Sequence, residues 1–384
     1  ATAPPPPRMS SMTRTETLTT PQLNRATLAR QMLLARQAVS PLAAVGRLCG
    51  MLAQEPRPPF VGLWTRLTTF AREDLHRALH DRTIVRGTLM RDTLHLMNAD
   101  DYAVHRMTLQ PMLSRIAAGI LRERADGLDV QAFVPVARAL LDEQPRTFNE
   151  LRPLLQAAFP HVDERALGYL ARTELPLVMI PTDGRWSFPA DSRFGLAEAL
   201  IDRPLANDGG PQALFLRYLA AFGPASVADF QQWSGFQSVK ATVEPLRPRL
   251  AIFQDERGRE LLDLPDAPRP DPAMPAPARF LPEFDNLLLS HADRSRILPD
   301  VYRRPVLGAK NGRIPGAFLV DGFVAGTWRI ERKRAAATLT LSPFAPLAKR
   351  EADEVEREGE ALLHFVEDDA TTFDIRQHPP GAAA

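Results

Sequence analysis

Two kinds of polar residue lie close together between residues 237 and 259. Gln237, Ser238 and Lys240 open a short segment with helical character, and Arg257 and Arg259 flank a glycine in a polar turn. Polar side chains in the first half of a helix can reach base edges in a DNA groove. Arginines on a loop contact phosphates or the minor groove. This stretch therefore predicts contact with a nucleic acid.

Further arginines fall in two other polar turns. Arg86 and Arg91 surround one turn, and Arg185 follows another. As a set spread over three turns, they favour recognition of backbone and shape over a sequence code. The chain has 43 arginines and four lysines. Arginine suits bidentate phosphate contacts, but a GC-rich genome explains the same excess, and any one arginine is equally well explained as a solvated charge.

Other chemistry has little support in the sequence. His76 and His80 have a spacing that can chelate a metal on a helix, but no third ligand and no HExxH glutamate accompany them. Cys49 is the single cysteine, which excludes an intrachain disulfide and fits a reducing cytosol. No GxGxxG, Walker A or GxSxG motif is present. We therefore predict no metal, no nucleotide cofactor and no other cofactor.

The polar turns each join two short apolar segments that follow helices. The three resulting hairpins are predicted near residues 84–97, 177–188 and 250–264. Their spacing is too long and uneven for a solenoid repeat. The third is the clearest, because Ser226 and Asp229 form a capping-box pattern for the helix that precedes the helix from Gln237 to about Leu246. Prolines shorten that last helix, which argues against deep insertion into the major groove.

This pattern predicts an α+β protein with three tandem winged helix-turn-helix units, followed by a small C-terminal α/β region with antiparallel strands. The predicted boundaries are a disordered tail at 1–21, winged helices at 22–98, 99–190 and 191–265, a proline-rich connector at 266–279, the C-terminal region at 280–370 and a second tail at 371–384.

Composition limits the protein class. The 384 residues are 45% hydrophobic and 24% charged, which is ordinary for a globular protein, and the formal net charge is only +1. No apolar run approaches the roughly 20 residues of a membrane helix, and the N-terminus has no secretory pattern. We expect a cytoplasmic protein without a membrane partner, associated with the nucleoid when bound to DNA. The oligomeric state stays open.

Five ordered stretches resemble one known family. They are GMLAQEPRPPFVGLWTRL (50–67), VRGTLMRDTLHLMNADDY (85–102), RYLAAFGPASVADFQQWSGF (217–236), LPEFDNLLLSHADR (281–294) and FLVDGFVAGTWRI (318–330). Together they resemble the tandem winged-helix family that includes the azinomycin-resistance DNA glycosylase and its bacterial relatives. The resemblance spans about residues 22–366.

The resemblance implies a concave DNA-binding channel lined by three winged helices and excision of bulky N-alkylated purines. The catalytic signature of the family is Gln-apolar-Gln or Gln-apolar-Asp at the end of a helix in the first unit. In this chain it falls on Leu52-Ala53-Gln54, so Gln54 supplies the second polar position and Leu52 replaces the first.

The leucine matters because base excision builds positive charge on the sugar and needs a positioned water. Two polar groups can orient that water and stabilise the oxocarbenium-like state, whereas leucine can do neither. Glu55 is an adjacent carboxylate, but neighbouring side chains on a helix diverge. Gln54 is equally well explained as an ordinary polar residue at a helix end.

Three hypotheses follow. The main one is a protein that binds duplex DNA through backbone and shape, with weak sequence preference and without catalysis. The alternative is a glycosylase for bulky alkylated purines, with Gln54 as the surviving catalytic residue. The near-neutral charge also leaves open winged helices that serve protein–protein contact.

Overall fold

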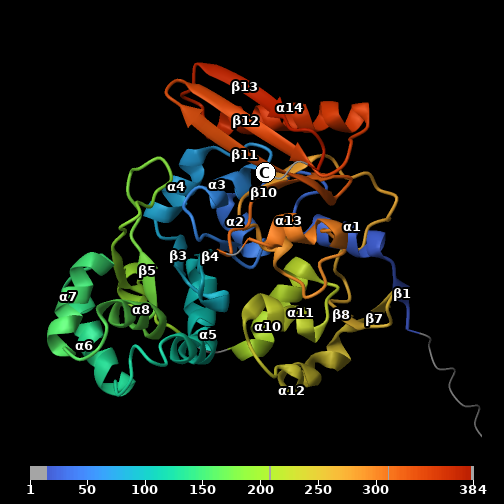
Figure 1. Ribbon diagram of the computed structural model, residues 1–384. Coiled ribbons are helices and arrows are strands. Elements are labelled where there is room, and N and C mark those ends of the chain that lie inside the picture. The colour runs from blue at the N-terminus through green and yellow to red at the C-terminus, as the bar shows by residue number, and fades with distance from the viewer. Residues whose placement is uncertain (1–14, 207–208, 310, 382–384) are drawn as a thin grey trace, which may run out of the picture.

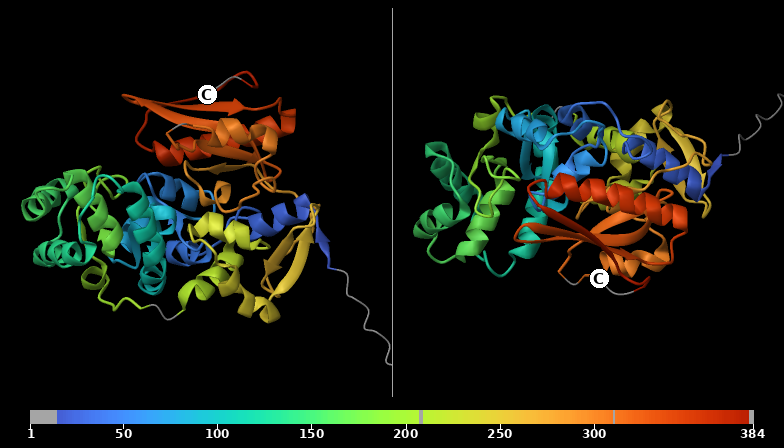
Figure 2. Two further views of the ribbon diagram at one scale, coloured as in Figure 1. Left: turned by 60° about the horizontal axis from the view of Figure 1, so that its bottom comes forward. Right: turned by 90° about the horizontal axis from the view of Figure 1, so that it is seen from above.

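The computed structural model describes residues 15–206, 209–309 and 311–381. Its strands form three sheets, with the orders β1-β7-β8, β2-β4-β3-β5-β6 and β13-β12-β11-β10-β9. Figure 1 shows the last of these above a broad layer made by the rest of the chain, and Figure 2 shows the same stacking from two other sides. The chain is thus a mixed α+β protein. None of the helices described is long and apolar enough to span a bilayer.

The N-terminal segment is structured from residue 15. Strand β1 (Thr17–Leu18) pairs in parallel with β7, and helix α1 (Thr20–Arg30) begins with a complete capping box formed by Thr19 and Gln22. The predicted tail at 1–21 is therefore wrong for residues 15–21, whereas 1–14 lie outside the described residues. Backbone pairing and the cap order this segment despite its polar composition.

The first helix–hairpin segment carries the region of the predicted catalytic signature. Its elements are α2 (Pro41–Arg47), β2 (Met51–Leu52), α3 (Pro58–Trp64), α4 (Arg72–His80), β3 (Ile84–Thr88), the 3-10 turn η1 (Met90–Asp92) and β4 (Leu94–Asn98). The hairpin predicted near 84–97 is confirmed, because β3 and β4 pair antiparallel along their full length.

The second segment shares its sheet with the first. Its elements are α5 (Ala99–Ile120), α6 (Val130–Glu143), α7 (Phe148–Ala158), α8 (Glu164–Glu174), β5 (Leu177–Met179), β6 (Phe194–Leu196) and α9 (Ala197–Ile201). The hairpin predicted at 177–188 is wrong in its second strand, because β5 pairs with β6 and, at Val178, with Gly87 of β3. The apolar residues Trp186 and Phe188 pack within the β5–β6 loop instead of entering a strand.

The third segment contains α10 (Gly210–Phe222), α11 (Val227–Ser234), α12 (Lys240–Val243), η2 (Glu244–Arg249), β7 (Ala251–Asp255) and β8 (Glu260–Asp263). The capping box of α11 and the hairpin near 250–264 are confirmed. The helix predicted from Gln237 is shorter than expected, since Ser238 has a positive φ of 56° and Pro245 lies in a 3-10 turn. Gln237 and Ser238 therefore precede α12.

The C-terminal region forms a five-stranded sheet against one helix. Its elements are β9 (Arg279–Leu281), η3 (Asn286–Leu288), η4 (Asp300–Tyr302), α13 (Arg303–Leu307), β10 (Gly316–Val320), β11 (Phe323–Lys333), β12 (Ala336–Pro343), α14 (Lys349–Val366) and β13 (Thr372–Gln377). The predicted antiparallel strands and helix are confirmed. The tail predicted at 371–384 is wrong for 372–377, because β13 pairs in parallel with β12; 382–384 lie outside the described residues.

Two buried ion pairs join these parts. Arg30 of α1 forms a bidentate pair with Asp263 at the end of β8, at 2.7 and 2.9 Å. Arg66, just after α3, pairs with Asp285 of the C-terminal region at 3.0 Å. All four side chains are at most 4% exposed. These contacts fix α1 against the third segment and α3 against the C-terminal region.

Removing Arg30 should destabilise the whole chain. Because Arg30→Met leaves the buried carboxylate of Asp263 with only the partly exposed Arg269 as an ion-pair partner among the described residues, we expect a loss of about 3–5 kcal/mol of unfolding free energy. The control is Arg376→Met, which removes the exposed pair of Arg376 with Asp374 and should cost below about 1 kcal/mol. Chemical denaturation followed by circular dichroism measures both. Equal midpoints for the two variants would contradict the structural role of the buried pair.

Candidate functional site

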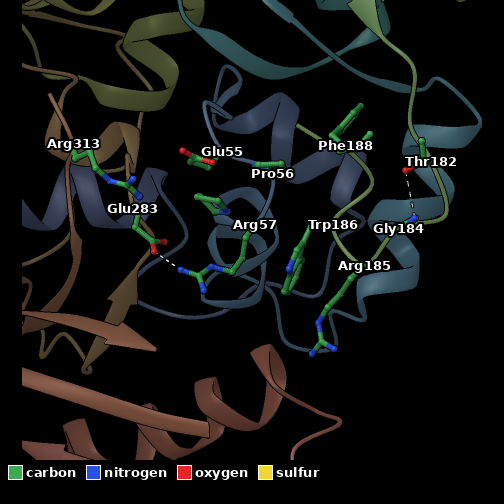
Figure 3. Close-up of a pocket in the computed structure, with 12 residues that line it drawn as sticks. Glu55, Pro56, Arg57, Thr182, Gly184, Arg185, Trp186, Phe188, Glu283 and Arg313 are labelled. Carbon is green, nitrogen blue, oxygen red and sulfur yellow. Dashed lines mark hydrogen bonds and ion pairs between the residues drawn. The ribbon is translucent and has the colours of Figure 1, made fainter. Parts of the chain in front are cut away.

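A pocket of about 360 Å³ lies between the first segment, the β5–β6 loop and the C-terminal region (Figure 3). Its walls combine aromatic rings and prolines with a few charged groups. The lining residues are Glu55, Pro56, Arg57, Pro58, Thr182, Gly184, Arg185, Trp186, Phe188, Pro189, Glu283 and Arg313. The segment 55–58 follows the predicted catalytic signature directly, so the pocket adjoins that signature.

The signature begins on strand β2 with Leu52 and continues beyond the strand through Ala53 and Gln54, so it does not lie at the end of a helix as expected. Helix α2 ends at Arg47, and the positive φ angles of Cys49 (54°) and Gly50 (87°) turn the chain into β2. Leu52 is buried and pairs with His95 of β4. The next residue continues the pairing, because the Ala53 N–H donates to the Leu94 carbonyl at 2.7 Å.

Gln54 is exposed, but its side chain has a structural partner. Its Oε1 accepts a hydrogen bond from the backbone N–H of Leu94 at 3.2 Å. The amide thus replaces a backbone carbonyl and extends the contact between β2 and β4 by one residue. Gln54 is not among the residues that line the pocket.

The side chain of Arg86 binds the backbone carbonyls of Ala53 and Gln54. Its Nε donates to the Ala53 carbonyl at 2.9 Å and its Nη2 to the Gln54 carbonyl at 3.2 Å, while the guanidinium lies over the ring of Phe188. Burial lowers the pKa of Arg86 to about 10, against the opposing charge of Glu55, so the group is cationic at neutral pH. The side chain of Arg86 is therefore buried under the segment and bound to its backbone, and the predicted DNA contact of Arg86 stays a prediction.

Glu55, in the bend that follows β2, is a carboxylate at the wall of the pocket. The residue is exposed, and the pocket also carries Trp186 and Phe188. Trp186 packs edge-on against Phe60 of α3 with ring centroids 5.2 Å apart, which fixes the indole. On the opposite side, Arg57 forms an ion pair with Glu283 of the C-terminal region. Among the described residues, Glu55 has no cation within ion-pair distance, and it shares the pocket with aromatic rings and with Arg57, Arg185 and Arg313.

The two histidines considered as metal ligands fasten the β5–β6 loop instead. His76 contacts the Ser187 hydroxyl through Nδ1 at 2.8 Å and the Arg185 carbonyl through Nε2 at 3.1 Å. His80 lies 3.6 Å from the carboxylate of Asp183. Among the described residues, no group of three or more histidine, cysteine or acidic side chains is arranged to hold a metal ion.

The arginines expected on the first two turns are engaged inside the protein. Arg91 bonds the Trp233 carbonyl and the Asn286 side chain, and burial lowers its pKa to about 10. The turn thus packs against the third segment and the C-terminal region, and the predicted DNA contact of Arg91 stays a prediction. Arg185 is half-buried and pairs with Asp368 and Asp369 at 2.7 and 2.9 Å.

The third segment keeps its predicted polar residues near the surface. Gln237, Ser238 and Lys240 are all exposed. Arg257 and Arg259 are partly exposed, but both pair with Asp293, at 2.9 and 2.5 Å, and their charge is partly neutralised. The two arginines thus present less free charge than the sequence suggested.

Sequence reasoning missed most of the pocket. The predicted hairpin at 177–188 places Trp186 and Phe188 on a strand, where side chains two residues apart face the same side, whereas the structure places both in a loop. Glu283 lies in the stretch LPEFDNLLLSHADR, which carried part of the family resemblance. Its contact with Arg57 joins residues 226 positions apart, and no local sequence pattern predicts such a pair.

The structure alone defines the class of protein as a mixed α+β fold in which helix–hairpin segments surround an aromatic pocket. The family model described as DNA glycosylase AlkZ-like matches residues 45–365, so the chain belongs to the AlkZ-like DNA glycosylase family. The interstrand DNA cross-link repair glycosylase of Streptomyces sahachiroi is 25% identical over 359 residues, covering 86% of this chain and 91% of that protein. The structure of the Streptomyces sahachiroi DNA glycosylase AlkZ superposes with a TM-score of 0.74 at 22% identity, over 94% of this chain and 100% of that one.

His95, which faces Leu52 across the sheet, should stay neutral at acid pH. It is fully buried, and burial, followed by the charge of Arg91, lowers its pKa to about 3. Because the unfolded chain takes up this proton near pH 6.5, unfolding free energy should fall as pH drops from about 6.5 towards 3, by up to about 1.4 kcal/mol per unit for this residue.

Nuclear magnetic resonance can check the titration directly. The imidazole Hε1 signal of His95, assigned by its loss in a His95→Gln variant, should not move between pH 8 and pH 5. His291, with a pKa also lowered to about 3 by burial, should behave alike. A titration midpoint above pH 5 for the His95 signal would contradict the prediction.

Proposed function

We propose that this protein binds duplex DNA and excises bulky, cationic N-alkylpurines, with Glu55 as the catalytic carboxylate. The observation that carries the proposal is the position of Glu55, an exposed acid at the wall of an aromatic pocket, immediately after the family's signature segment. Family membership and the glycosylase description of the Streptomyces sahachiroi relative support the class of reaction.

The chemistry of the lesion makes one carboxylate sufficient. Alkylation at N7 or N3 gives the purine a positive charge, so the base leaves with the electron pair of its bond to C1′. The sugar becomes oxocarbenium-like, and Glu55 stabilises this cation and accepts a proton from the water that attacks C1′. The products are the free alkylated base and an abasic site. Leu52 can do none of this, and the side-chain carbonyl of Gln54 is occupied by Leu94.

The aromatic walls suit the leaving base. An extruded purine gains from stacking on the partly exposed Trp186, whereas Phe188 is buried beneath the guanidinium of Arg86 and shapes the wall. The ion pair between Arg57 and Glu283 closes the side of the pocket opposite Trp186 and does not involve Glu55. The pocket volume of about 360 Å³ gives room for an alkyl substituent on an extruded base.

For the remainder of the duplex we propose that the three helix–hairpin segments act as winged helices. In the third segment, the exposed polar residues are Gln237 and Ser238, which precede α12, and Lys240, which begins it. Three arginines reach phosphates only while they remain in ion pairs: Arg185, Arg257 and Arg259. Few unpaired groups then face the bases, which favours weak sequence preference.

Binding without excision is the second candidate function. The observation that favours it is Leu52, which is 7% exposed, lies in β2 and removes one polar group from the signature. In this case the pocket recognises the alkylated base and the bond to the sugar stays intact.

Release of 7-methylguanine from a duplex oligonucleotide separates the candidates. We expect slow release by the native protein and a loss of about 10²-fold in Glu55→Gln, with DNA affinity unchanged within twofold. Gln54→Ala should retain release within a fewfold, because its amide serves β4. The matched control is Glu283→Gln, which removes a carboxylate of the same pocket that is paired with Arg57 and should retain most of the rate.

A Leu52→Gln variant completes the test. Faster release than in the native protein would show that both polar groups act on one site. Release in Leu52→Gln alone, with none in the native protein, would overturn excision by Glu55 and support binding without catalysis. Equal release by Glu55→Gln and the native protein would remove Glu55 from the mechanism.

A further inference from the structure

A second cleft of about 280 Å³ lies between the end of α5 and helices α7 and α8, in the part of the molecule at the lower left of Figure 1. It is lined by Ile120, Leu121, Arg124, Phe148, Arg152, Arg165, Ala166, Gly168, Tyr169 and Arg172. None of these residues lines the pocket that contains Glu55, and none of them is acidic.

Four guanidinium groups from three chain segments meet at this cleft. Arg172 pairs with the buried carboxylate of Asp92 at 3.5 Å. Within the described part of the chain, Arg124, Arg152 and Arg165 have no acid within ion-pair distance. This contrasts with Arg257 and Arg259, whose charges are met by Asp293. The cleft therefore gathers free positive charge, in a protein whose formal net charge is only +1.

Arg152 is held in place by its surroundings. Its guanidinium lies over the ring of Phe148, and its stem lies across Gly168 of α8. A Cβ on Gly168 would come within 2.8 Å of the Arg152 Nε, so the missing side chain makes room for the arginine. That Nε, like the Nε of Arg172, is buried without a hydrogen-bond partner in the described structure. Arg152 is thus held in a fixed position while its Nε has no hydrogen-bond acceptor and its charge has no acidic partner among the described residues.

The remainder of the lining is flat and apolar. Tyr169 lies under the guanidinium of Arg172, at 5.0 Å, and its hydroxyl bonds Asp92. Ile120 is 57% exposed at the rim. Arginines beside aromatic and aliphatic surface match a nucleotide, which presents a phosphate next to a planar base.

We propose that this α7–α8 cleft is a second DNA contact, which holds a backbone phosphate with Arg124, Arg152 and Arg165 and an adjacent base or sugar against Tyr169. The ligand is a phosphodiester of the strand that flanks the lesion. The inference deepens the proposed function and rests on it, because it assumes DNA as the substrate. It moves the main phosphate contact from the predicted hairpin arginines to the helices of the second segment.

The experiment compares two double variants of the full chain. Arg152→Gln with Arg165→Gln removes two unpaired charges from the cleft, and Arg329→Gln with Arg376→Gln removes two exposed, acid-paired charges from the C-terminal sheet. Binding to a 20-base-pair duplex is measured by fluorescence anisotropy across a salt series. We expect the cleft variant to lose about tenfold in affinity and about 1–2 units of the salt slope, and the control to stay within twofold.

Two further measurements keep the outcome specific. Gly168→Ala retains every charge but displaces Arg152, so it should lose severalfold in affinity while its thermal midpoint stays near that of the native protein. Excision at saturating protein should be unchanged in the cleft variant, since Glu55 is not touched. Equal affinity and equal salt slope in the native protein and the cleft variant would overturn the inference.

A single-stranded pentathymidylate separates this inference from the proposed function. Binding by the native protein and not by the cleft variant supports the cleft even if no base is released from alkylated duplex. Displacement of the pentanucleotide by inorganic phosphate at equal affinity would identify a phosphate-ion site and overturn the DNA assignment. If the native protein binds neither the duplex nor the pentanucleotide, both the cleft assignment and the proposed function are overturned. If it binds both, and the cleft variant binds them with the same affinities, only the cleft assignment is overturned.

Discussion

The arrangement of this protein depends on charges that are buried in pairs between its parts. Arg66 and Asp285 lie at the far end of α3 from Arg57, which pairs with Glu283 only two residues before Asp285. The C-terminal region therefore contacts both ends of one short helix. A buried ion pair contributes little net stability but tolerates little displacement, because either charge alone is costly in the interior. The walls of the pocket are in this way held at a fixed separation by contacts that lie beside it.

The same constraint explains why an arginine-rich chain has few arginines available for a ligand. Arg30, Arg66, Arg86 and Arg91 are directed inward, where they bind carboxylates or backbone carbonyls of segments distant in sequence. A guanidinium suits this role because its fork of donors can satisfy several acceptors at once. These residues add to the positive charge in the composition, but in the structure their side chains hold distant segments of the chain together. Among the described residues, Arg124, Arg152 and Arg165 at the α7–α8 cleft belong to the arginines that no ion pair engages.

The sequence predicted the local elements well and the long-range pairing poorly. The caps at Ser226 and Asp229, the hairpins near 84–97 and 250–264 and the C-terminal strands depend on neighbouring residues, and each was found. Pairing of β3 with β5 and the return of β6 after a 14-residue loop depend on contacts across segments, and neither leaves a local pattern. At the site, Gln54 was identified through resemblance, while its hydrogen bond to Leu94 and the walls at Trp186 and Glu283 required the fold.

Around the signature, the backbone is held independently of the side chain at its first position. Arg86 donates to the carbonyls of residues 53 and 54, and the amide of Gln54 continues the β2–β4 pairing, so the path of the chain into the pocket does not require a glutamine at position 52. Leu52 fits this framework as a buried residue opposite His95, whose Nε2 has no partner among the described residues. The framework and the chemistry are thus separable. The first can persist without the second, and in the proposed function the chemistry belongs to Glu55, which follows the signature directly at the wall of the pocket.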